Sequence, residues 1–393
     1  MFIVGIDIAK FNHEAIIIDS KGKIIRKAFP FKNTSEGFEI LLSELNSVSN
    51  NISDFTIAME STSHYWIPLY SALLRNDFNV IVINPIQSDA LRNLYIRQIK
   101  SDAHDCYVIA EVIRFGHYSE QPIQSTEYYE LRELCRERTF IVDMCADLKK
   151  KVIALLDQVF PEYQSLFSDI FGFTSTELLI NCCTPEDLIN ISLEDLTKLI
   201  SKVSKNKFRE AKAKEIKEAA RTSLGITLGV NSFKMLIKQH TEHVKFMKKQ
   251  IEEIDEKIFE LFSNFECYIT TIPGIGPVLG ATIFSEIGDI SRFASSSKLA
   301  AFAGIDPTIK QSGEYSSTKN HMSKRGSPYL RRAIWQAAIR AAMYEPNLKE
   351  FLAKKKLEGK PYMNSIGHVT RKLTNIIYAV MRDNKPYYTP IRT

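Results

Sequence analysis

Short apolar runs alternate with amphipathic patterns over the amino-terminal part of the chain. Runs rich in β-branched and aromatic residues predict strands at 2–8, 14–19, 23–31, 55–59 and 79–83. Apolar residues at helical spacing predict helices that open at Thr34 and that cover 64–74 and 102–115. Polar turn residues separate the first three runs, so the connections between those strands are expected to be short.

The order of these elements is three strands, a helix, a strand, a helix, a strand and a helix. Three consecutive strands joined by short turns favour an antiparallel meander, and the later alternation with helices favours parallel additions to the same sheet. This is the element order of a ribonuclease-H-like fold. We therefore expect an α/β domain at the amino terminus.

From Tyr128 the pattern changes to long helices. The first is expected to end before Pro161, and a basic stretch over 198–221, with nine Lys/Arg against three Glu, also favours helix. Farther on, positions in steps of four and three span four heptads: Phe233, Ile237, His240, Val244, Met247, Ile251, Ile254, Ile258 and Leu261. This repeat predicts a coiled coil. Two alternatives are one long helix packed on its own domain and an antiparallel hairpin with the helix before Pro161.

After Cys267 the pattern predicts a compact helical region. Helices are expected around 278–287, 296–303, 327–343, 347–356 and 364–382. Before them, Pro273-Gly-Ile-Gly276 looks like a helix-hairpin-helix, in which Gly274 and Gly276 would let backbone N–H groups at a helix start approach a phosphate closely. A plain turn between helices is the alternative interpretation of this segment.

Composition places the chain among folded proteins. Hydrophobic residues make up 45% and charged residues 25%, and 51 Lys/Arg against 46 Asp/Glu give a net charge of +5, which is weak evidence for a polyanionic partner. The six cysteines show neither a CxxC pair nor zinc-finger spacing and are expected to be reduced thiols. The chain contains no apolar run of membrane-spanning length and no signal-peptide pattern, so we expect a cytoplasmic protein that does not contact a membrane.

Two carboxylates end predicted strands whose other residues are apolar. Asp7 interrupts the first strand and Glu60 ends the fourth in the same way. A charge in such a position costs several kcal/mol unless it is paired or bound to a metal ion. If the first and fourth strands are neighbours, the two carboxylates meet at one end of the sheet.

Two further carboxylates, Asp102 and Asp105, begin the last helix of this region. Their spacing of three residues places them about 5–6 Å apart on one helix face. Four carboxylates without soft ligands suit hard ions such as Mg²⁺ or Mn²⁺, and two such ions at ~3.5–4 Å clamp the attacking and leaving oxygens of a phosphodiester.

Each of these acids also has an alternative interpretation when it is taken alone. Asp7 could be a phosphate-loop acid of an actin-like ATPase, although such a site needs a Gly-Thr/Ser-rich turn where Ala9-Lys10-Phe11 stands. Asp102 could be a helix N-cap. The combined order, spacing and element type of the four acids favour the metal site.

A polar, glycine-containing and basic segment precedes the helix expected at 327–343. From Lys310 to Arg340 there are seven Lys/Arg and one acid. Four of these cations, Lys324, Arg325, Arg331 and Arg332, approach the helix start and predict contacts with nucleic-acid phosphates. A solvated surface is the alternative. Among the serines 312, 316, 317 and 323, the chemistry of the residues alone selects none.

The chain resembles the DEDD-type insertion-sequence transposases, a family that includes the Piv DNA invertases and the bridge-RNA-guided recombinases. The matching segments lie at both ends: Gly5-Ile-Asp-Ile-Ala-Lys10, Glu60-Ser-Thr, Ile83-Asn-Pro85, Lys100-Ser-Asp-Ala-His-Asp105, Ile272-Pro-Gly-Ile-Gly276, Phe302-Ala-Gly-Ile-Asp-Pro307, Gln311-Ser-Gly313 and Met322-Ser-Lys-Arg-Gly326. The region around 160–230 matches less clearly. Cys106 stands where the family usually has Ala, which we expect to have little effect.

The resemblance implies three parts: a RuvC-like catalytic domain over 1–125, a helical coiled-coil assembly region over 126–265, and a transposase domain over 266–393. It implies that Asp7, Glu60, Asp102 and Asp105 are the catalytic, metal-binding acids. It also implies that Ser312 is the nucleophile, which would attack a DNA phosphodiester and form a phosphoserine link.

The resemblance further implies partners. These are DNA, as element ends and target, a structured non-coding guide RNA, and further copies of the chain in a homodimer or tetramer. In such an assembly the acids and the serine come from different protomers, and the long helices carry and join the domains.

Two other functions are consistent with the same residues. A Holliday-junction resolvase would use the four acids with metal-activated water, which gives Ser312 no role. A non-catalytic nucleic-acid-binding assembly protein would keep the fold alone, although all four acids and the Ser-Gly pair are present.

Overall fold

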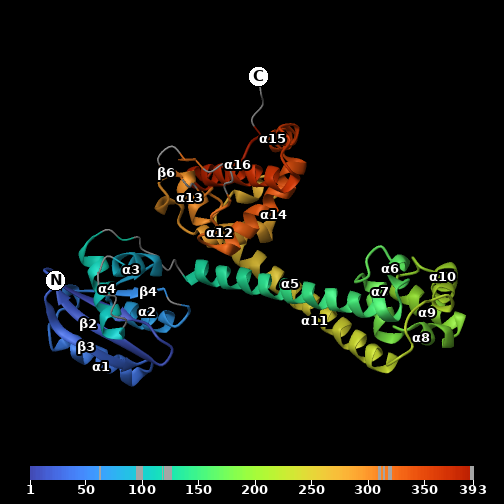
Figure 1. Ribbon diagram of the computed structural model, residues 1–393, viewed down its shortest axis with the longest axis horizontal. Helices are drawn as coiled ribbons and strands as arrows, with labels where there is room; N and C mark the ends of the chain where they lie inside the picture. Colours follow the sequence, from blue (N-terminus) through green and yellow to red (C-terminus); the bar gives the residue numbers. More distant parts are fainter. Residues whose placement is uncertain are drawn as a thin grey trace. The chain divides into compact units, whose positions relative to one another are not determined.

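The computed structural model divides into two compact units, Met1–Ile123 and Gln124–Thr393 (Figure 1). The residues that it describes are 1–61, 63–93, 101–116, 118, 126–308 and 321–389, together with the backbone of 311–312 and 315–316. The predicted boundaries at 125 and 265 stay predictions.

The first unit is built on one mixed sheet. Its strands are β1 (Phe2–Asp7), β2 (Asn12–Asp19), β3 (Ile24–Lys32), β4 (Phe55–Glu60) and β5 (Asn79–Ile83). The sheet order is β3-β2-β1-β4-β5, in which β1, β2 and β3 pair antiparallel and β4 pairs parallel with both β1 and β5. The predicted meander with parallel additions is therefore present, and this arrangement is compatible with a ribonuclease-H-like domain.

Helices cover both faces of this sheet. They are α1 (Ser35–Asn46), α2 (Trp66–Arg75), α3 (Pro85–Arg92) and α4 (Asp102–Arg114), with a short 3₁₀ turn η1 (Ile52–Asp54) before β4. Because side chains alternate along a strand, Val4 and Ile6 face α1 and α2, whereas Ile3 faces α4. Gly5 lies on the α4 face, where a Cβ atom would stand 2.0 Å from the carbonyl oxygen of Cys106. Glycine thus lets α4 pack directly on β1.

The second unit contains two long antiparallel helices, α5 (Thr126–Val159) and α11 (Val230–Ser263). Each has 34 residues, which corresponds to about 50 Å. Leu131 shares a buried cluster with Ile258, whereas Val152, near the other end of α5, clusters with Val244. The structure therefore contains the intramolecular hairpin that was one of the predicted alternatives. Its regular heptad packing stays a prediction.

Five short helices pack at one end of this hairpin (Figure 1). They are α6 (Tyr163–Leu166), α7 (Phe173–Asn181), α8 (Pro185–Asn190), α9 (Leu193–Val203) and α10 (Glu210–Arg221). Tyr163, Leu178 and Ile216 are fully buried in one core together with Val152 and Val244 of the long helices. Burial of each such apolar side chain contributes about 1.5–3 kcal/mol, so the shared core fixes the five helices to this end of the hairpin.

One predicted helix is wrong in this region. The basic stretch over 198–221 forms two helices, because the backbone adopts left-handed conformations at Lys205 (φ 52°) and Asn206 (φ 64°). The Ser204 side chain accepts a hydrogen bond from the backbone N–H of Phe208 at 2.9 Å, which closes the turn. Short polar side chains compete for backbone groups in this way and interrupt helices.

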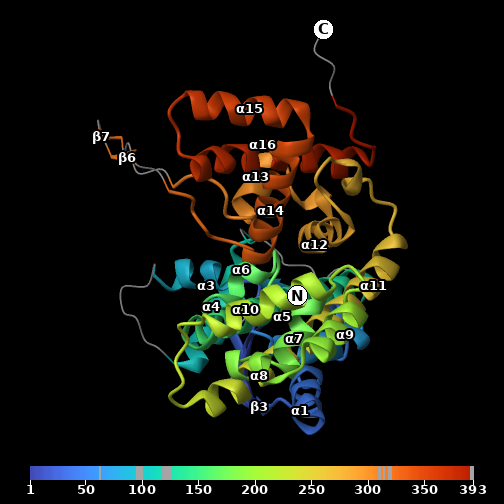
Figure 2. The ribbon, with the colours of Figure 1, turned by 90° about the vertical axis from the view of Figure 1, so that its right-hand side faces the viewer.

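The carboxy-terminal part of the second unit is also helical. It contains η2 (Ile269–Thr271), α12 (Pro277–Ile287), η3 (Ile290–Arg292), α13 (Ser296–Phe302), α14 (Pro328–Tyr344), α15 (Pro346–Leu357) and α16 (Tyr362–Asp383). Two strands of two residues each, β6 (Gln311–Ser312) and β7 (Tyr315–Ser316), pair antiparallel. Figure 2 shows α16 between α15 and α14. The predicted helices of this region are confirmed to within two residues at each end.

Among the helices of the described ranges, none combines the length and the apolar character needed to cross a bilayer.

Candidate active site

Asp7 and Glu60 end two neighbouring parallel strands. β1 and β4 pair up to Ile6 and Met59, so the next residue of each strand is a carboxylate at the same edge of the sheet. Both lie on the face that packs against α4, since they alternate with Ile6 and Met59 on the opposite face. The predicted neighbourhood of the first and fourth strands is therefore present.

Asp102 and Asp105 lie in the first turn of α4. The N-cap of this helix is Ser101, whose hydroxyl accepts a hydrogen bond from the backbone N–H of His104 at 3.3 Å. The alternative interpretation of Asp102 as the N-cap is therefore wrong. A hydroxyl one residue earlier satisfies the helix start and leaves the Asp102 carboxylate available for other contacts.

The four acids influence one another electrostatically. Burial, followed by the negative charges of Asp105, Glu60 and Asp102, raises the pKa of Asp7 to about 6. Like charges close to a partly buried carboxylate disfavour its ionised form unless a cation neutralises them. The structure thus brings the four predicted acids into one region of negative charge.

The donor chemistry of this region fits a hard divalent ion, because every donor is a carboxylate oxygen. Within the described residues, however, no three His, Cys, Asp or Glu side chains are grouped closely enough to hold an ion. The side chains would have to close around an ion when it binds, with water or substrate oxygens completing its coordination.

Arg92 supplies a local positive charge at this site. Its Nε and Nη2 atoms each lie 3.1 Å from Oδ1 of Asp105, and its Nη1 atom lies 2.5 Å from Oδ1 of Asp89. Arg92 ends α3, a helix that starts with a capping box formed by Asn84 and Gln87. The Asn-Pro pair noted in the sequence thus begins the helix that delivers an arginine to the acidic set.

Sequence reasoning missed a fifth carboxylate, Glu14. It lies directly opposite Asp7 in the β1–β2 pairing and faces α4, as do Ile16 and Ile18 of the same strand. Burial and then the charge of Asp102 raise the pKa of Glu14. The alternation of β2, combined with the short turn that fixes the register of β1 and β2, is the signal that could have identified it.

The buried Cys106 thiol lies in α4, directly after Asp105. Burial, followed by the charges of Glu14 and Asp7, raises its pKa to about 12. The thiol is therefore protonated at neutral pH and is neither a nucleophile nor a strong metal ligand there.

The serine predicted from the resemblance lies in the second unit. Ser312 is in β6, and its backbone pairs with Tyr315 of β7. Its side chain, and the whole of Gly313, lie outside the described residues. Another serine from the same predicted loop, Ser323, donates a hydrogen bond to Oδ1 of Asp306 at 2.5 Å.

The predicted basic contacts divide into two pairs. Lys324 and Arg325 are exposed, whereas Arg331 and Arg332 make contacts within the unit. Arg331 donates to the carbonyl oxygen of Ala303 at 3.2 Å, and Arg332 forms two hydrogen bonds of 2.6 and 2.7 Å with Asp143 of α5. A role in phosphate binding stays a prediction for all four.

The two predicted glycines have different surroundings. Gly274 has a positive φ of 94°, and a Cβ atom there would lie 2.4 Å from the backbone nitrogen of Ala341 in α14. Its lack of a side chain is therefore explained by close packing of two segments. Gly276 is the N-cap of α12, and open space lies where its Cβ would be. Only Gly276 leaves room for a ligand at a helix start; the helix-hairpin-helix stays a prediction.

Comparisons with known proteins match both ends of the chain. A family model described as a transposase, of the DEDD type of the IS110 element, matches residues 4–161. A second model, described as transposase of the IS116/IS110/IS902 family, matches residues 267–353. The segment over 162–266, which includes α6 to α10, lies between the two matched ranges.

Two of the following relatives extend over nearly the whole chain and one over three quarters of it. An uncharacterized 44.8 kDa protein of insertion element IS116 from Streptomyces clavuligerus is 25% identical over 98% of this chain and 96% of its own length. A pilin gene-inverting protein from Moraxella lacunata is 23% identical over 98% of this chain and 97% of its own length. An uncharacterized 42 kDa protein of insertion element IS900 from Mycobacterium paratuberculosis is 25% identical over 75% of this chain and 74% of its own length. With both matched ranges from one family, the chain belongs to the IS110 family of transposases.

Proposed function

We propose that this chain is a transposase or site-specific recombinase of an insertion sequence that cuts and rejoins DNA with the help of Mg²⁺ or Mn²⁺. The observation that carries the proposal is the position of Asp7, whose carboxylate lies near Glu60, Asp102 and Asp105 at the edge of the sheet. Membership of a transposase family supports the same conclusion.

The four carboxylates would hold the ions from two directions. Asp7 and Glu60 are fixed by paired strands, and Asp102 and Asp105 are fixed by one helix turn, so the donors approach from two directions. A bound divalent ion would supply positive charge to phosphodiester oxygens and would lower the pKa of an attacking hydroxyl. Glu14 extends the donor set on the β2 side. Arg92 either yields Asp105 to an ion or holds that carboxylate in place.

Ser312 is the proposed nucleophile. Its hydroxyl oxygen forms a bond to the phosphorus of a DNA phosphodiester while the bond from phosphorus to a deoxyribose oxygen breaks. The departing oxygen leaves as a hydroxyl group after it takes up the serine proton. Rejoining reverses this exchange with the hydroxyl group of another DNA strand, so no external energy source is required.

The acids and Ser312 belong to different compact units. We propose that they meet in a DNA-bound homodimer or tetramer, in which one copy supplies the acids and another supplies the serine. The long hairpin of α5 and α11, with its heptad spacing, is the proposed assembly element. The exposed Lys324 and Arg325, together with the start of α12 at Gly276, are the proposed contacts with DNA phosphates.

A structured non-coding RNA is the proposed guide to target and donor DNA. The support for it is the resemblance to bridge-RNA-guided recombinases. If the guide acts by base pairing, reprogramming its target-complementary bases redirects recombination without any change in the protein.

A covalent adduct tests the proposed chemistry. Wild-type protein, mixed with element-end DNA, the transcribed RNA that flanks the gene and Mg²⁺, should give a protein–DNA species that resists denaturation, and peptide mapping should place the DNA on Ser312. Ser312→Ala should give none, whereas the matched control Ser316→Ala, in the neighbouring strand, should behave as wild type. A Ser312→Ala protein that still cuts at the normal rate would favour water as nucleophile, as in a junction resolvase.

A mixing experiment tests whether the site is shared between copies. Asp7→Asn and Ser312→Ala are each expected to be inactive alone. Their mixture should regain part of the activity, because some assemblies combine an intact acidic set with an intact serine. No recovery in demonstrably mixed assemblies would place both sets in the same copy.

A further inference from the structure

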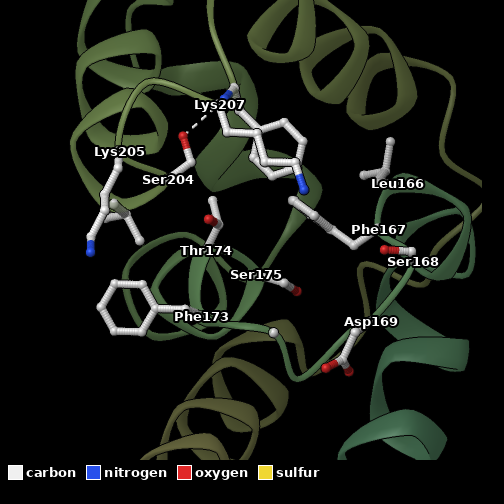
Figure 3. A pocket seen from close by; sticks show the side chains of 13 residues that line it. Leu166, Phe167, Ser168, Asp169, Phe173, Thr174, Ser175, Ser204, Lys205 and Lys207 are labelled. Carbon is white, nitrogen blue, oxygen red and sulfur yellow. Dashed lines mark hydrogen bonds between the residues drawn. The ribbon is translucent and has the colours of Figure 1, made fainter.

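A solvent-open cavity of about 460 Å³ lies between the α6–α7 segment and the turn that joins α9 to α10, far along the chain from the acidic set (Figure 3). Its walls are the segment over 166–175, which joins α6 to α7, and the turn over 203–208, which joins α9 to α10. Cavities of about 300–1,000 Å³ are typical of small-molecule and cofactor sites. Neither family model covers this segment, so the matched family does not assign the cavity a role.

One wall carries two lysines on a turn that is closed by hydrogen bonds. Lys205 and Lys207 flank Asn206 between α9 and α10. The turn is closed by the Ser204–Phe208 hydrogen bond drawn in Figure 3, and Ser201 donates to the carbonyl oxygen of Phe208 at 2.9 Å. These bonds fix the backbone of the turn, so both lysine side chains start beside the cavity.

These two lysines of the turn differ from lysines on the two helices that adjoin it. Lys198 of α9 pairs with Glu194 at 2.7 Å, and Lys214 of α10 pairs with Glu210 at 2.7 Å. Within the part of the chain that the structure describes, Lys205 and Lys207 form no ion pair; Lys207 lies over the ring of Phe208 at 5.9 Å. Their charges are therefore available to an anion.

The opposite wall offers an aromatic ring and a helix start. α7 begins at Phe173, and its N-cap, Gly172, has no side chain with which to accept hydrogen bonds from the first backbone N–H groups. Those groups and the hydroxyl of Thr174 are positioned to meet a negatively charged oxygen. The one carboxylate of this wall, Asp169, accepts a hydrogen bond from the backbone N–H of Phe171 at 2.9 Å.

Phe173 is exposed over 67% of its surface although it lines the cavity. Figure 3 shows it and Thr174 facing Lys205 and Ser204 across the cavity. An inorganic anion would account for the lysines and the helix start but would leave the ring unused. A base joined to a phosphate uses all of these groups, because the base can stack on the ring while the phosphate meets the positive wall.

We propose that this cavity binds an unpaired nucleotide of a single-stranded nucleic acid. The base stacks on Phe173, and the adjoining phosphate lies between Lys205, Lys207 and the start of α7. A duplex holds its bases in stacks and cannot deliver one to the ring, so the site selects single strands. The inference is independent of the acidic site and of Ser312.

Binding of full-length protein to short fluorescent oligonucleotides tests the proposal. The probes are an oligouridylate, an oligothymidylate of equal length and a mixed-sequence duplex, in buffer with EDTA so that divalent ions do not contribute. Phe173→Ala should weaken single-strand binding about five- to hundredfold without changing its salt dependence. Lys205→Gln with Lys207→Gln should lower the salt slope by about 0.7, because the two lysines together neutralise one phosphate of the single strand. The ratio of the two single-strand affinities identifies RNA or DNA as the preferred source.

Matched controls separate the cavity from general surface charge. Lys198→Gln with Lys214→Gln removes the same charge from the two adjoining helices, and Phe259→Ala removes a ring on α11 that is 60% exposed. Both controls should bind as wild type. Photocrosslinking of an oligonucleotide that carries 5-iodouracil should label Phe173, and thermal melting should show that the variants are folded.

Each result of these binding experiments either supports the proposal or overturns it. Loss of single-strand affinity in the cavity variants alone, with a crosslink at Phe173, supports the proposal. Equal losses in the cavity and control variants, a crosslink only elsewhere, or unchanged binding by Phe173→Ala would each overturn it. Competition by inorganic phosphate without any effect of the ring would identify a simple anion site and would also overturn it.

Discussion

Two acids in this protein, one partly buried and one fully buried, have opposite surroundings. Asp7, at the end of β1, is surrounded by the carboxylates of the acidic set, and its pKa is raised to about 6 by burial and by their charges. Glu286, in α12, is also buried, but Arg136 of α5 donates to both of its oxygens at 2.6 and 3.2 Å. Ser327, at the start of α14, donates a third hydrogen bond at 2.7 Å.

The surroundings of the two acids indicate a structural role for Glu286 and a ligand-binding role for Asp7. Burial alone lowers the pKa of Arg136, but the hydrogen bond and charge of Glu286 outweigh it and raise that pKa overall. A buried charge whose partners are all present holds three helices together. Within the described residues, Asp7 accepts a backbone hydrogen bond at Ile8 but forms no ion pair, so a ligand of opposite charge would complete its site.

The largest effect is expected when the charge of Asp7 is removed. Asp7→Asn should reduce DNA cleavage roughly a thousandfold, because the charge stabilisation that a metal ion provides is worth several kcal/mol. The same variant should melt at an equal or higher temperature in metal-free buffer, because it removes repulsion between like charges. Cleavage of labelled element-end DNA and thermal melting measure the two effects. A clearly less stable variant would mean that Asp7 is compensated as Glu286 is.

Removing the charge of Glu286 should instead lower the stability of the second unit. Glu286→Ala should destabilise the second unit by about 1.5–3 kcal/mol, because the half-buried Arg136 and the hydroxyl of Ser327 lose their charged hydrogen-bond partner. Denaturation in urea measures this effect, with Glu260→Ala on the exposed surface of α11 as the control. Replacing both partners, in Arg136→Met with Glu286→Gln, should recover much of the loss. A Glu286→Ala variant as stable as wild type would show that the pair contributes nothing net.

The sequence predicted the acidic set because its signals are local. Asp7 and Glu60 interrupt apolar strands, and Asp102 and Asp105 share a helix turn, so each is visible in its own segment. Parallel pairing of β1 and β4 then follows from the order of the elements. To identify Glu14, one would also need the register of β1 against β2. The length of the turn between the two strands indicates this register but does not determine it.

Contacts between distant segments were beyond prediction. Nothing local shows that Arg92 meets Asp105, or that Arg332 meets Asp143, 189 residues earlier. The break at Ser204 was missed because the basic pattern continues through it, whereas a side-chain hydrogen bond decides the backbone. Ser312 was named only through the family resemblance, since a polar loop with several serines offers no physical reason to choose one.

Glu14 provides a graded test of the acidic set. Glu14→Gln should weaken Mn²⁺ binding about tenfold, the lower end of the effect expected for a residue that supports a metal site, whereas Asp7→Asn should nearly abolish it. Titration calorimetry on the protein without DNA measures both. Glu39→Gln, an exposed acid of α1 on the opposite face of the sheet, is the matched control. If Glu14→Gln and Glu39→Gln bind Mn²⁺ equally well, Glu14 is a neighbour of the site and not a part of it.

The smallest effect is expected at a third kind of acid, the half-exposed Asp143. The hydrogen bonds from Arg332 lower the pKa of Asp143, yet water reaches both side chains, so the pair should stabilise the protein by less than about 1 kcal/mol. Arg332→Ala should therefore leave the urea midpoint almost unchanged. It should also lower the salt slope of DNA binding by less than Arg325→Ala does, because Arg332 is already paired whereas Arg325 is exposed, and each phosphate contact contributes about 0.9 to that slope. Equal slope changes would mean that Arg332 leaves Asp143 for a phosphate when DNA binds. A large loss of stability would instead place this pair with Glu286 and Arg136 as a structural link between α5 and α14.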